Sequence, residues 1–140
     1  MRKPLILVNL LSGEHRNLRK QLVALNSPAS KQLHHIVVTD FGEETTAEEA
    51  EAQFAECLQF FLSQEGGDEG GGGGEEGGPP PGCENPDVGE STVMSPGYGT
   101  TFDLKVESGH TYLLACFLPD KEGSPPHAAA HDMFKAFTVA

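Results

Sequence analysis

The sequence predicts an all-β domain, a β-sandwich with one inserted α-helix, and three observations lead to this prediction. Short apolar runs separated by turn residues recur along most of the chain, as is typical of strands joined by tight turns. The chain contains 17 Gly and 10 Pro but no Trp, which favours turns over a helical bundle. One central stretch has helical periodicity instead. The length of 140 residues suits a single core, so residues 1–140 are predicted to form one domain.

Strand signals are clearest in the second half of the sequence. Phe102, Leu104 and Val106 alternate with polar residues, the pattern of a strand with one buried face. In the last predicted strand, Phe134, Ala136 and Thr138 lie on one face, and Lys135, Phe137 and Val139 lie on the other. The predicted strands cover residues 4–11, 21–26, 33–39, 89–94, 100–106, 111–117 and 134–139.

The predicted helix covers about residues 46–64. Thr46 and Glu49 form a capping box, in which each side chain binds the free backbone N–H of the other at a helix start. Apolar residues then recur three or four positions apart. Residues 66–82 contain ten glycines and four acids, too little apolar surface to offset the entropy of ordering, so we expect a flexible acidic loop. Helix and loop together form an expected insertion at about residues 41–87.

The charge of the chain limits its partners. The formal net charge is −12, which disfavours nucleic acid and anionic membranes as main partners. No apolar run reaches the roughly 18 residues of a membrane span. Residues 1–31 are basic, and their beginning resembles a secretory signal, but Asn9 interrupts the apolar run and no Ala-x-Ala site follows. We therefore expect a strand there rather than a signal peptide.

Metal-ligand chemistry is concentrated in two places, at His34-His35 and at residues 116–133. The second stretch places Cys116 at the end of an apolar strand, and His127 and Met133 in the loop before the last strand. A blue-copper site needs such a set, because one thiolate and two imidazoles form a trigonal ligand group with a distant axial thioether. The remaining His must come from a distant strand that the sandwich brings alongside.

The two stretches also carry a family resemblance. The segment Leu33-His34-His35-Ile36-Val37-Val38 resembles the Pro-His-Asn-Val-Val strand that provides the first ligand of cupredoxins, and residues 109–120 resemble the strand that leads into their ligand Cys. Pro126-His127 and Met133 resemble the last ligands. The chain thus resembles the cupredoxin (blue copper) family over about residues 20–40 and 88–139. It departs in its loop: ten residues separate Cys116 from His127, and Asp132 stands where a Gly normally precedes the Met.

The resemblance implies a Greek-key β-sandwich with one mononuclear copper ion, bound by His34, Cys116 and His127 with Met133 axial. It implies single-electron transfer or copper carriage, with the His127 edge near the surface as the exit for electrons. We expect an extracytoplasmic monomer whose acidic surface steers a redox partner with a basic docking face. An enzyme is not expected, since Gly-x-Ser-x-Gly and Cys-x-x-Cys are absent.

Several alternatives remain open at this stage. Cys116 is also explained as a buried core thiol. His34 and His35 point to opposite faces of a strand, so one of them is expected to face solvent, and His35 or His131 could replace one of the named ligands. The alternative function is a metal-free cupredoxin-like module that binds a protein or has a structural role. Cys57 and Cys83 bracket the Gly-rich loop, and we favour a disulfide between them over reduced thiols.

Overall fold

The computed structural model describes residues 9–10, 18–65 and 78–140, and these form two antiparallel sheets and one long helix. One sheet has the strand order β1-β2-β5 and the other has the order β4-β3-β6-β7. The strands are β1 (Asn9–Leu10), β2 (Leu18–Leu25), β3 (Val37–Gly42), β4 (Asp87–Glu90), β5 (Gly99–Val106), β6 (Thr111–Ala115) and β7 (Phe134–Thr138). The helices are α1 (Ala47–Glu65), the single 3₁₀ turn η1 (Pro81–Cys83) and α2 (His127–Ala130).

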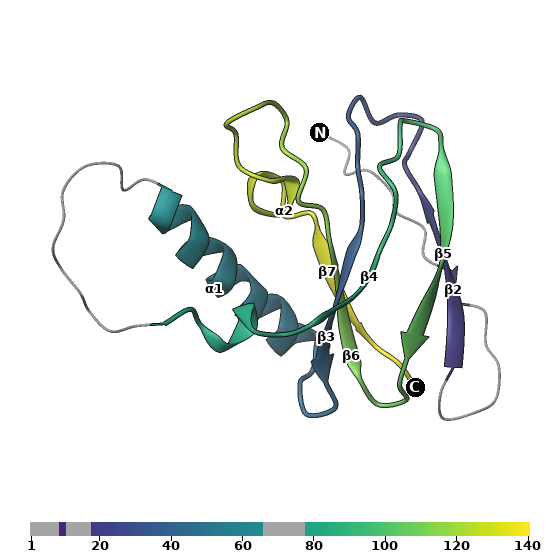
Figure 1. The fold of residues 1–140 in the computed structure, drawn as a ribbon, viewed down its shortest axis with the longest axis vertical. Coiled ribbons are helices and arrows are strands. Elements are labelled where there is room, and N and C mark those ends of the chain that lie inside the picture. The colour runs from purple at the N-terminus through teal and green to yellow at the C-terminus, as the bar shows by residue number, and fades with distance from the viewer. Residues whose placement is uncertain (1–8, 11–17, 66–77) are drawn as a thin grey trace, which may run out of the picture.

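The molecule has three layers, because the four-stranded sheet is covered on both faces (Figure 1). Leu22 and Leu104 from one sheet pack against Val38 and Leu114 from the other, which makes the core of the sandwich. On the opposite face of the four-stranded sheet, Phe54 of α1 and its neighbours form a second core. All five residues of β6 are buried, which explains why this strand reads as a continuous apolar run rather than an alternating one. The β-sandwich prediction is therefore confirmed.

The burial pattern follows the alternation expected from the sequence. In β5, Leu104 and Val106 are buried while Asp103 and Lys105 are exposed. In β7, Ala136 belongs to the core beneath α1, and Val139, directly after the strand, belongs to the sandwich core. Both faces of residues 134–139 therefore meet a core.

Several predicted strand boundaries differ from the structure: β2 begins three residues before the predicted 21–26, and β6 ends two residues before the end of the predicted 111–117. The third strand is β3, Val37–Gly42, so the prediction of residues 33–39 is wrong at both ends. His34 and His35 precede this strand, and His34 is paired only through an isolated bridge to Met94. The strand predicted at 89–94 is β4, Asp87–Glu90. The predicted strand 4–11 lies outside the described residues except for Asn9–Leu10, which is β1.

Helix α1 begins where the sequence predicts. The Thr46 hydroxyl accepts the Glu49 N–H at 3.2 Å, and the Glu49 carboxylate accepts the Thr46 N–H at 2.8 Å. This reciprocal cap defines the start of the helix. Among the described residues, no helix is both long enough and apolar enough to cross a membrane.

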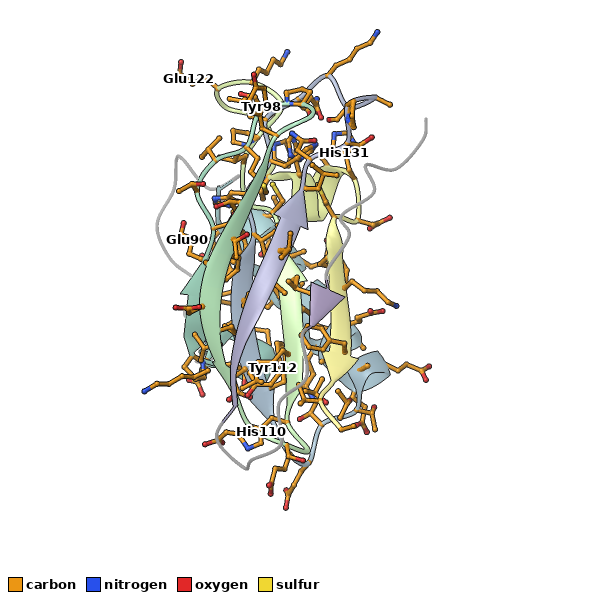
Figure 2. The ribbon with its side chains drawn as sticks, turned by 90° about the vertical axis from the view of Figure 1, so that its right-hand side faces the viewer. Glu90, Tyr98, His110, Tyr112, Glu122 and His131 are labelled. Atoms are coloured by element: carbon orange, nitrogen blue, oxygen red, sulfur yellow. A yellow bond between two sulfur atoms is a disulfide. The ribbon has the colours of Figure 1, made fainter. Side chains whose placement is uncertain are left out.

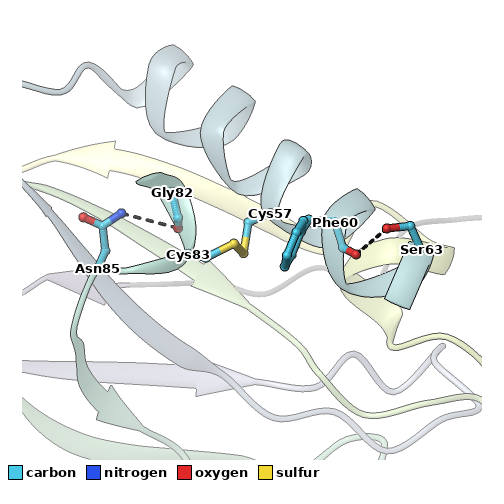
Figure 3. Close-up of a disulfide and its surroundings, with 6 residues drawn as sticks. All are labelled: Cys57, Phe60, Ser63, Gly82, Cys83 and Asn85. Atoms are coloured by element: carbon cyan, nitrogen blue, oxygen red, sulfur yellow. Dashed lines mark hydrogen bonds between the residues drawn. A yellow bond between two sulfur atoms is a disulfide. The ribbon is translucent and has the colours of Figure 1, made fainter. Parts of the chain in front are cut away.

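A disulfide joins α1 to the turn that follows the Gly-rich stretch (Figure 3). It links Cys57 to Cys83 of η1, as favoured from the sequence, with Cα atoms 5.3 Å apart. Gly82 lies against the helix backbone so closely that a Cβ would come within 2.5 Å of the Gln53 carbonyl oxygen. This position therefore requires glycine. Most of the predicted acidic loop, residues 66–77, lies outside the described residues.

Candidate metal centre

Three side chains from separate segments meet at the end of the sandwich where α2 lies (Figure 1). Cys116 directly follows β6, His127 begins α2, and His34 lies three residues before β3. Their exposed fractions are 1%, 1% and 3%, so all three are buried. The Cys116 Sγ lies 3.5 Å from His127 Nδ1 and 3.8 Å from His34 Nδ1, and the two Nδ1 atoms are 3.1 Å apart.

The position of His34 is fixed by a buried amide. Asn26 is 1% exposed, and its Nδ2 donates to the backbone carbonyls of Met94 and Gln32, each at 2.9 Å. Met94 in turn exchanges two backbone hydrogen bonds with His34. The hydroxyl of Ser30 lies 3.0 Å from His34 Nε2. These contacts hold the imidazole so that Nδ1 points toward Cys116 and His127.

His35 supports the centre without entering it. Its backbone N–H donates to Cys116 Sγ at 3.5 Å, and its Nε2 accepts the Phe117 N–H at 3.0 Å. The ring therefore ties the segment before β3 to the segment after β6. His35 does point away from His34's site, but the expectation that it faces solvent is wrong, because its side chain is only 12% exposed. Its contact with Phe117 explains this burial.

The long loop between Cys116 and His127 closes on itself. Pro119 and Pro126 form an isolated antiparallel bridge, and the His127 N–H donates to the Leu118 carbonyl at 2.8 Å. The Ala128 N–H donates to the Cys116 carbonyl at 2.8 Å. The residues between Pro119 and Pro126 thus form a loop whose two ends are hydrogen-bonded together. The greater length of this loop does not separate the two side chains.

Met133 joins the centre through its backbone. Its carbonyl accepts the Cys116 N–H at 3.1 Å, and its N–H donates to the His127 carbonyl at 3.3 Å. Asp132, the residue before it, has a φ of 49°, in the left-handed region that favours Gly and tolerates Asp and Asn. Asp is therefore compatible with the backbone conformation at this position. An axial role for the Met133 thioether stays a prediction.

His131 lies outside the three-residue cluster and contacts Asp120 instead. Its Nε2 is 2.8 Å from Asp120 Oδ2, and Gln32 donates a hydrogen bond to the same carboxylate. Asp120 Oδ1 also lies 3.0 Å from His127 Nε2, without hydrogen-bond geometry. Figure 2 shows His131 at the same end of the sandwich as Tyr98, opposite His110.

The His127 ring does not reach the surface, contrary to the expectation that its edge lies there, and its role as an exit for electrons stays a prediction. The ring is 1% exposed because Asp120 and His131 lie against its outer nitrogen. Among the described residues, no hydrogen-bond partner reaches this Nε2, although it is buried. Asp120, Ser30 and Gln32 were not singled out in the sequence. The i, i+4 spacing of His127 and His131 is the one local signal that points to this second group.

The surroundings determine the protonation of two members of the cluster. Burial, reinforced by His127 and His131, lowers the pKa of His34 from 6.5 to about 4. The ring is therefore neutral at pH 7 and has a lone pair to offer. Burial raises the pKa of the Cys116 thiol, against the N–H groups of His35 and Leu118, which lower it. A metal ion that binds here must displace the thiol proton.

The spacing of the three atoms fits one metal ion. A metal about 2.0 Å from imidazole nitrogen and about 2.3 Å from thiolate sulfur, at tetrahedral to trigonal angles, places two nitrogens roughly 3.4 Å apart and nitrogen and sulfur roughly 3.6 Å apart. The observed separations of 3.1, 3.5 and 3.8 Å lie around these values. With both Nδ1 atoms as ligands, each Nε2 carries the proton. Ser30 Oγ lies 3.0 Å from the Nε2 of His34, and Asp120 Oδ1 lies 3.0 Å from the Nε2 of His127 without hydrogen-bond geometry.

Comparisons of the chain with protein-family models, with curated proteins and with solved structures found no significant match.

Proposed function

We propose that the protein is a mononuclear copper protein of the cupredoxin type that carries single electrons or copper itself. One observation carries the proposal: His34, Cys116 and His127 come from three separate segments, and their ligand atoms meet within 3.8 Å in a buried position. Packing alone explains a buried Cys, and it also explains a buried His. It does not explain why two imidazole nitrogens and a sulfur converge at the spacing of a trigonal ligand set.

The ligand set favours copper over the other metals that proteins hold. Thiolate and imidazole are soft and borderline ligands, and a His₂Cys trigonal set with a weak axial thioether is the ligand combination of blue-copper sites. Met133 would supply that thioether, and the sandwich would have the Greek-key topology of the family. A bound copper ion supplies one-electron redox chemistry. The residues of the chain hold it away from water, and the His35 N–H stabilises the negative charge on Cys116.

The disulfide supports an extracytoplasmic location for the protein. Cys57 and Cys83 are paired, whereas Cys116 remains a free thiol. Structural disulfides persist in oxidising compartments and are rare in the cytosol. The third cysteine, Cys116, lies between two imidazoles and is not part of a disulfide. This placement favours a role for its thiol as a metal ligand.

A redox partner would dock beside Phe117. Cys116 is 1% exposed, but the next residue, Phe117, is 39% exposed, which gives a short covalent route from the centre to the surface. Phe117 lines a shallow groove with His35, Asp87 and Glu90. The two acids there, together with the net charge of −12, match a basic docking face on the partner. Electron transfer to such a partner should slow as ionic strength rises.

A pair of adjacent histidines offers the sharpest test of the ligand set. We expect His34→Gln to lose stoichiometric Cu(II) binding, because it removes a ligand nitrogen of the cluster. His35→Gln is the matched control, since this side chain lies outside the cluster and the Gln side-chain oxygen lies near the position of Nε2, where it can still accept the Phe117 N–H. Copper per chain is measured after gel filtration, with circular dichroism as the check of folding. Equal copper binding by both variants would contradict the proposal.

A metal-free β-sandwich module is the second candidate, and one contact favours it. If His34 carries its proton on Nδ1, that N–H can donate to His127 Nδ1 at 3.1 Å, so the cluster is satisfied without a metal. Ser30 would then donate its hydroxyl proton to His34 Nε2. The module would act by binding a protein partner or by stabilising an assembly. It predicts that no divalent or monovalent copper binds at one equivalent per chain.

A further inference from the structure

A second group of ligand atoms lies on the outer side of His127. Asp120 Oδ1 lies 3.0 Å from the Nε2 of His127 and 3.0 Å from the Nε2 of His131. Each of the three residues offers a ligand atom, and these atoms lie within 4.8 Å of one another. His127 is buried, whereas the side chains of Asp120 and His131 are 35% and 31% exposed, so the group opens to solvent on one side. It is distinct from the buried cluster, which uses the other nitrogen of the same ring.

The group is held in place by the fold rather than by chance surface contact. His127 and His131 are four residues apart across α2, and the His131 N–H donates to the His127 carbonyl at 2.9 Å. This spacing presents both rings on one side of the turn, with centroids 5.5 Å apart. Gln32, from a segment distant in sequence, donates to Asp120 and fixes the carboxylate between them.

The buried nitrogen itself points to a ligand. His127 Nε2 is inaccessible to solvent and has no hydrogen-bond partner among the described residues, yet it lies 3.0 Å from Asp120 Oδ1. A buried polar atom without a hydrogen-bond partner destabilises the fold. A cation between this nitrogen, the carboxylate and His131 would satisfy it, since two imidazoles and a carboxylate are a common ligand set for zinc and related divalent ions.

We propose that Asp120, His131 and the Nε2 of His127 form an outer site for a divalent transition-metal ion such as Zn²⁺, filled in alternation with the inner site. The existence of the outer site does not depend on the proposed function. Only the alternation with the inner site rests on it. A neutral imidazole carries one N–H, so His127 offers one nitrogen lone pair at a time. When Nε2 binds outside, the Nδ1–H donates to His34. When Nδ1 binds inside, Nε2 carries the proton and cannot bind an ion outside.

The geometry makes the outer site a loading position for the inner one. The outer group has open access to solvent, and the inner cluster does not. An ion captured by Asp120 and His131 lies one imidazole ring away from Cys116 and His34. Passage inward exchanges a hard carboxylate for a soft thiolate, which a copper ion prefers and Zn²⁺ tolerates.

The test uses the full-length Cys116→Ala chain, which lacks the inner thiolate, and Zn²⁺ as the probe in calorimetric titrations. We expect one Zn²⁺ per chain, and binding at least about tenfold weaker when Asp120→Asn or His131→Ala is added. Cys116→Ala with Asp132→Asn is the matched control, because Asp132 is an exposed acid next to His131 in the sequence but outside the group, and Asn suits its backbone conformation. This variant should bind Zn²⁺ as the parent does.

Two results would overturn the proposal. The first is a folded Cys116→Ala chain that binds no Zn²⁺, or an Asp120→Asn effect equal to that of Asp132→Asn. The second is a wild-type chain already loaded with copper that binds one Zn²⁺ with the affinity of the Cys116→Ala chain, which would exclude alternation. Failure of the inner site is seen separately, as the absence of a copper–thiolate absorption band in the wild type. A chain with that band and no outer Zn²⁺ would keep the proposed function and lose only this inference.

Discussion

The Sγ of Cys116 and the Nδ1 of His127 lie 3.5 Å apart, although ten residues separate the two in sequence. The contact exists because the chain leaves and returns through the paired residues Pro119 and Pro126. The backbone of His127 then binds the Leu118 carbonyl, so the ring is placed by hydrogen bonds at the base of the loop. The length of the loop is therefore uncoupled from the distance between Cys116 Sγ and His127 Nδ1.

This uncoupling predicts that the tip of the loop can be shortened without loss of the metal. Residues 121–124 form a turn closed by hydrogen bonds between Lys121 and Ser124. We expect replacement of these four residues by Asn-Gly to leave copper stoichiometry unchanged and stability within about 1 kcal/mol. Insertion of two glycines between Phe117 and Leu118 should abolish copper binding, because it separates Cys116 from the base of the loop. Loss of copper in the shortened chain would contradict the account of the loop.

The disulfide is predicted to stabilise the fold without contributing to the centre. It closes a segment with a sequence separation of 26. In the chain-entropy model, removal of such a link costs roughly 3 kcal/mol. Cys57→Ser/Cys83→Ser should therefore lower the free energy of unfolding, measured by denaturant titration, while copper per folded chain stays the same. Altered copper binding by the folded double variant would show that α1 acts on the centre.

The cap of α1 is expected to contribute about 1 kcal/mol to stability. Thr46→Ala removes the hydroxyl that accepts the Glu49 N–H. Thr45→Ala is the matched control, one residue earlier, where no side-chain hydrogen bond is formed with the described residues. Urea denaturation measures the free energy of unfolding of the two variants. Equal destabilisation would mean that the cap has no specific role.

Stability should fall at alkaline pH because of a buried tyrosine. Tyr112 is 1% exposed, and its hydroxyl accepts the Glu107 N–H at 2.8 Å. Burial raises its pKa above the ordinary value of 10.0. Between these two pKa values, the unfolded chain has lost the phenol proton and the folded chain has kept it, so the free energy of unfolding decreases as pH rises.

Tyr112→Phe should remove this decrease, while it costs about 1 kcal/mol near neutral pH through the lost hydrogen bond. Tyr98→Phe is the matched control, because Tyr98 is 70% exposed and is the other of the two tyrosines. Thermal unfolding of the three chains between pH 8 and about 11 measures the effect. If the stability of Tyr112→Phe falls with rising pH as steeply as that of the wild type, groups other than Tyr112 cause the decrease.

Local signals predicted those parts of the fold that local chemistry determines. The capping box lies within one turn of Thr46, so the start of α1 follows from the sequence alone. The ends of β3 depend on its partner instead. The strand continues to Gly42 because it pairs with Thr111 of β6, which no nearby residue indicates. The expectation that His35 faces solvent failed for the same reason, since Phe117 covers it from a distant segment.

The candidate site was predicted to a similar extent. His34, Cys116 and His127 were predicted as a set from the resemblance of their segments to those of cupredoxins, and the structure brings their side chains together. Asp120 carried no recognisable signal, because its contact with His127 depends on how the loop folds back. The buried position of His127 follows from the same folding of the loop. A sequence pattern indicates which candidate ligand residues are present. Their burial depends on tertiary contacts that the pattern does not show.

The visible absorption spectrum of the purified chain during titration with Cu(II) tests the central claim most directly. The account predicts an intense band toward the red end of the spectrum that saturates at one copper per chain, from charge transfer between the Cys116 thiolate and copper. Cys116→Ser should lack the band, while Cys57→Ser/Cys83→Ser should keep it. A folded wild-type chain without the band, whose Cys116 reacts as an ordinary buried thiol, would contradict the claim that this centre binds copper.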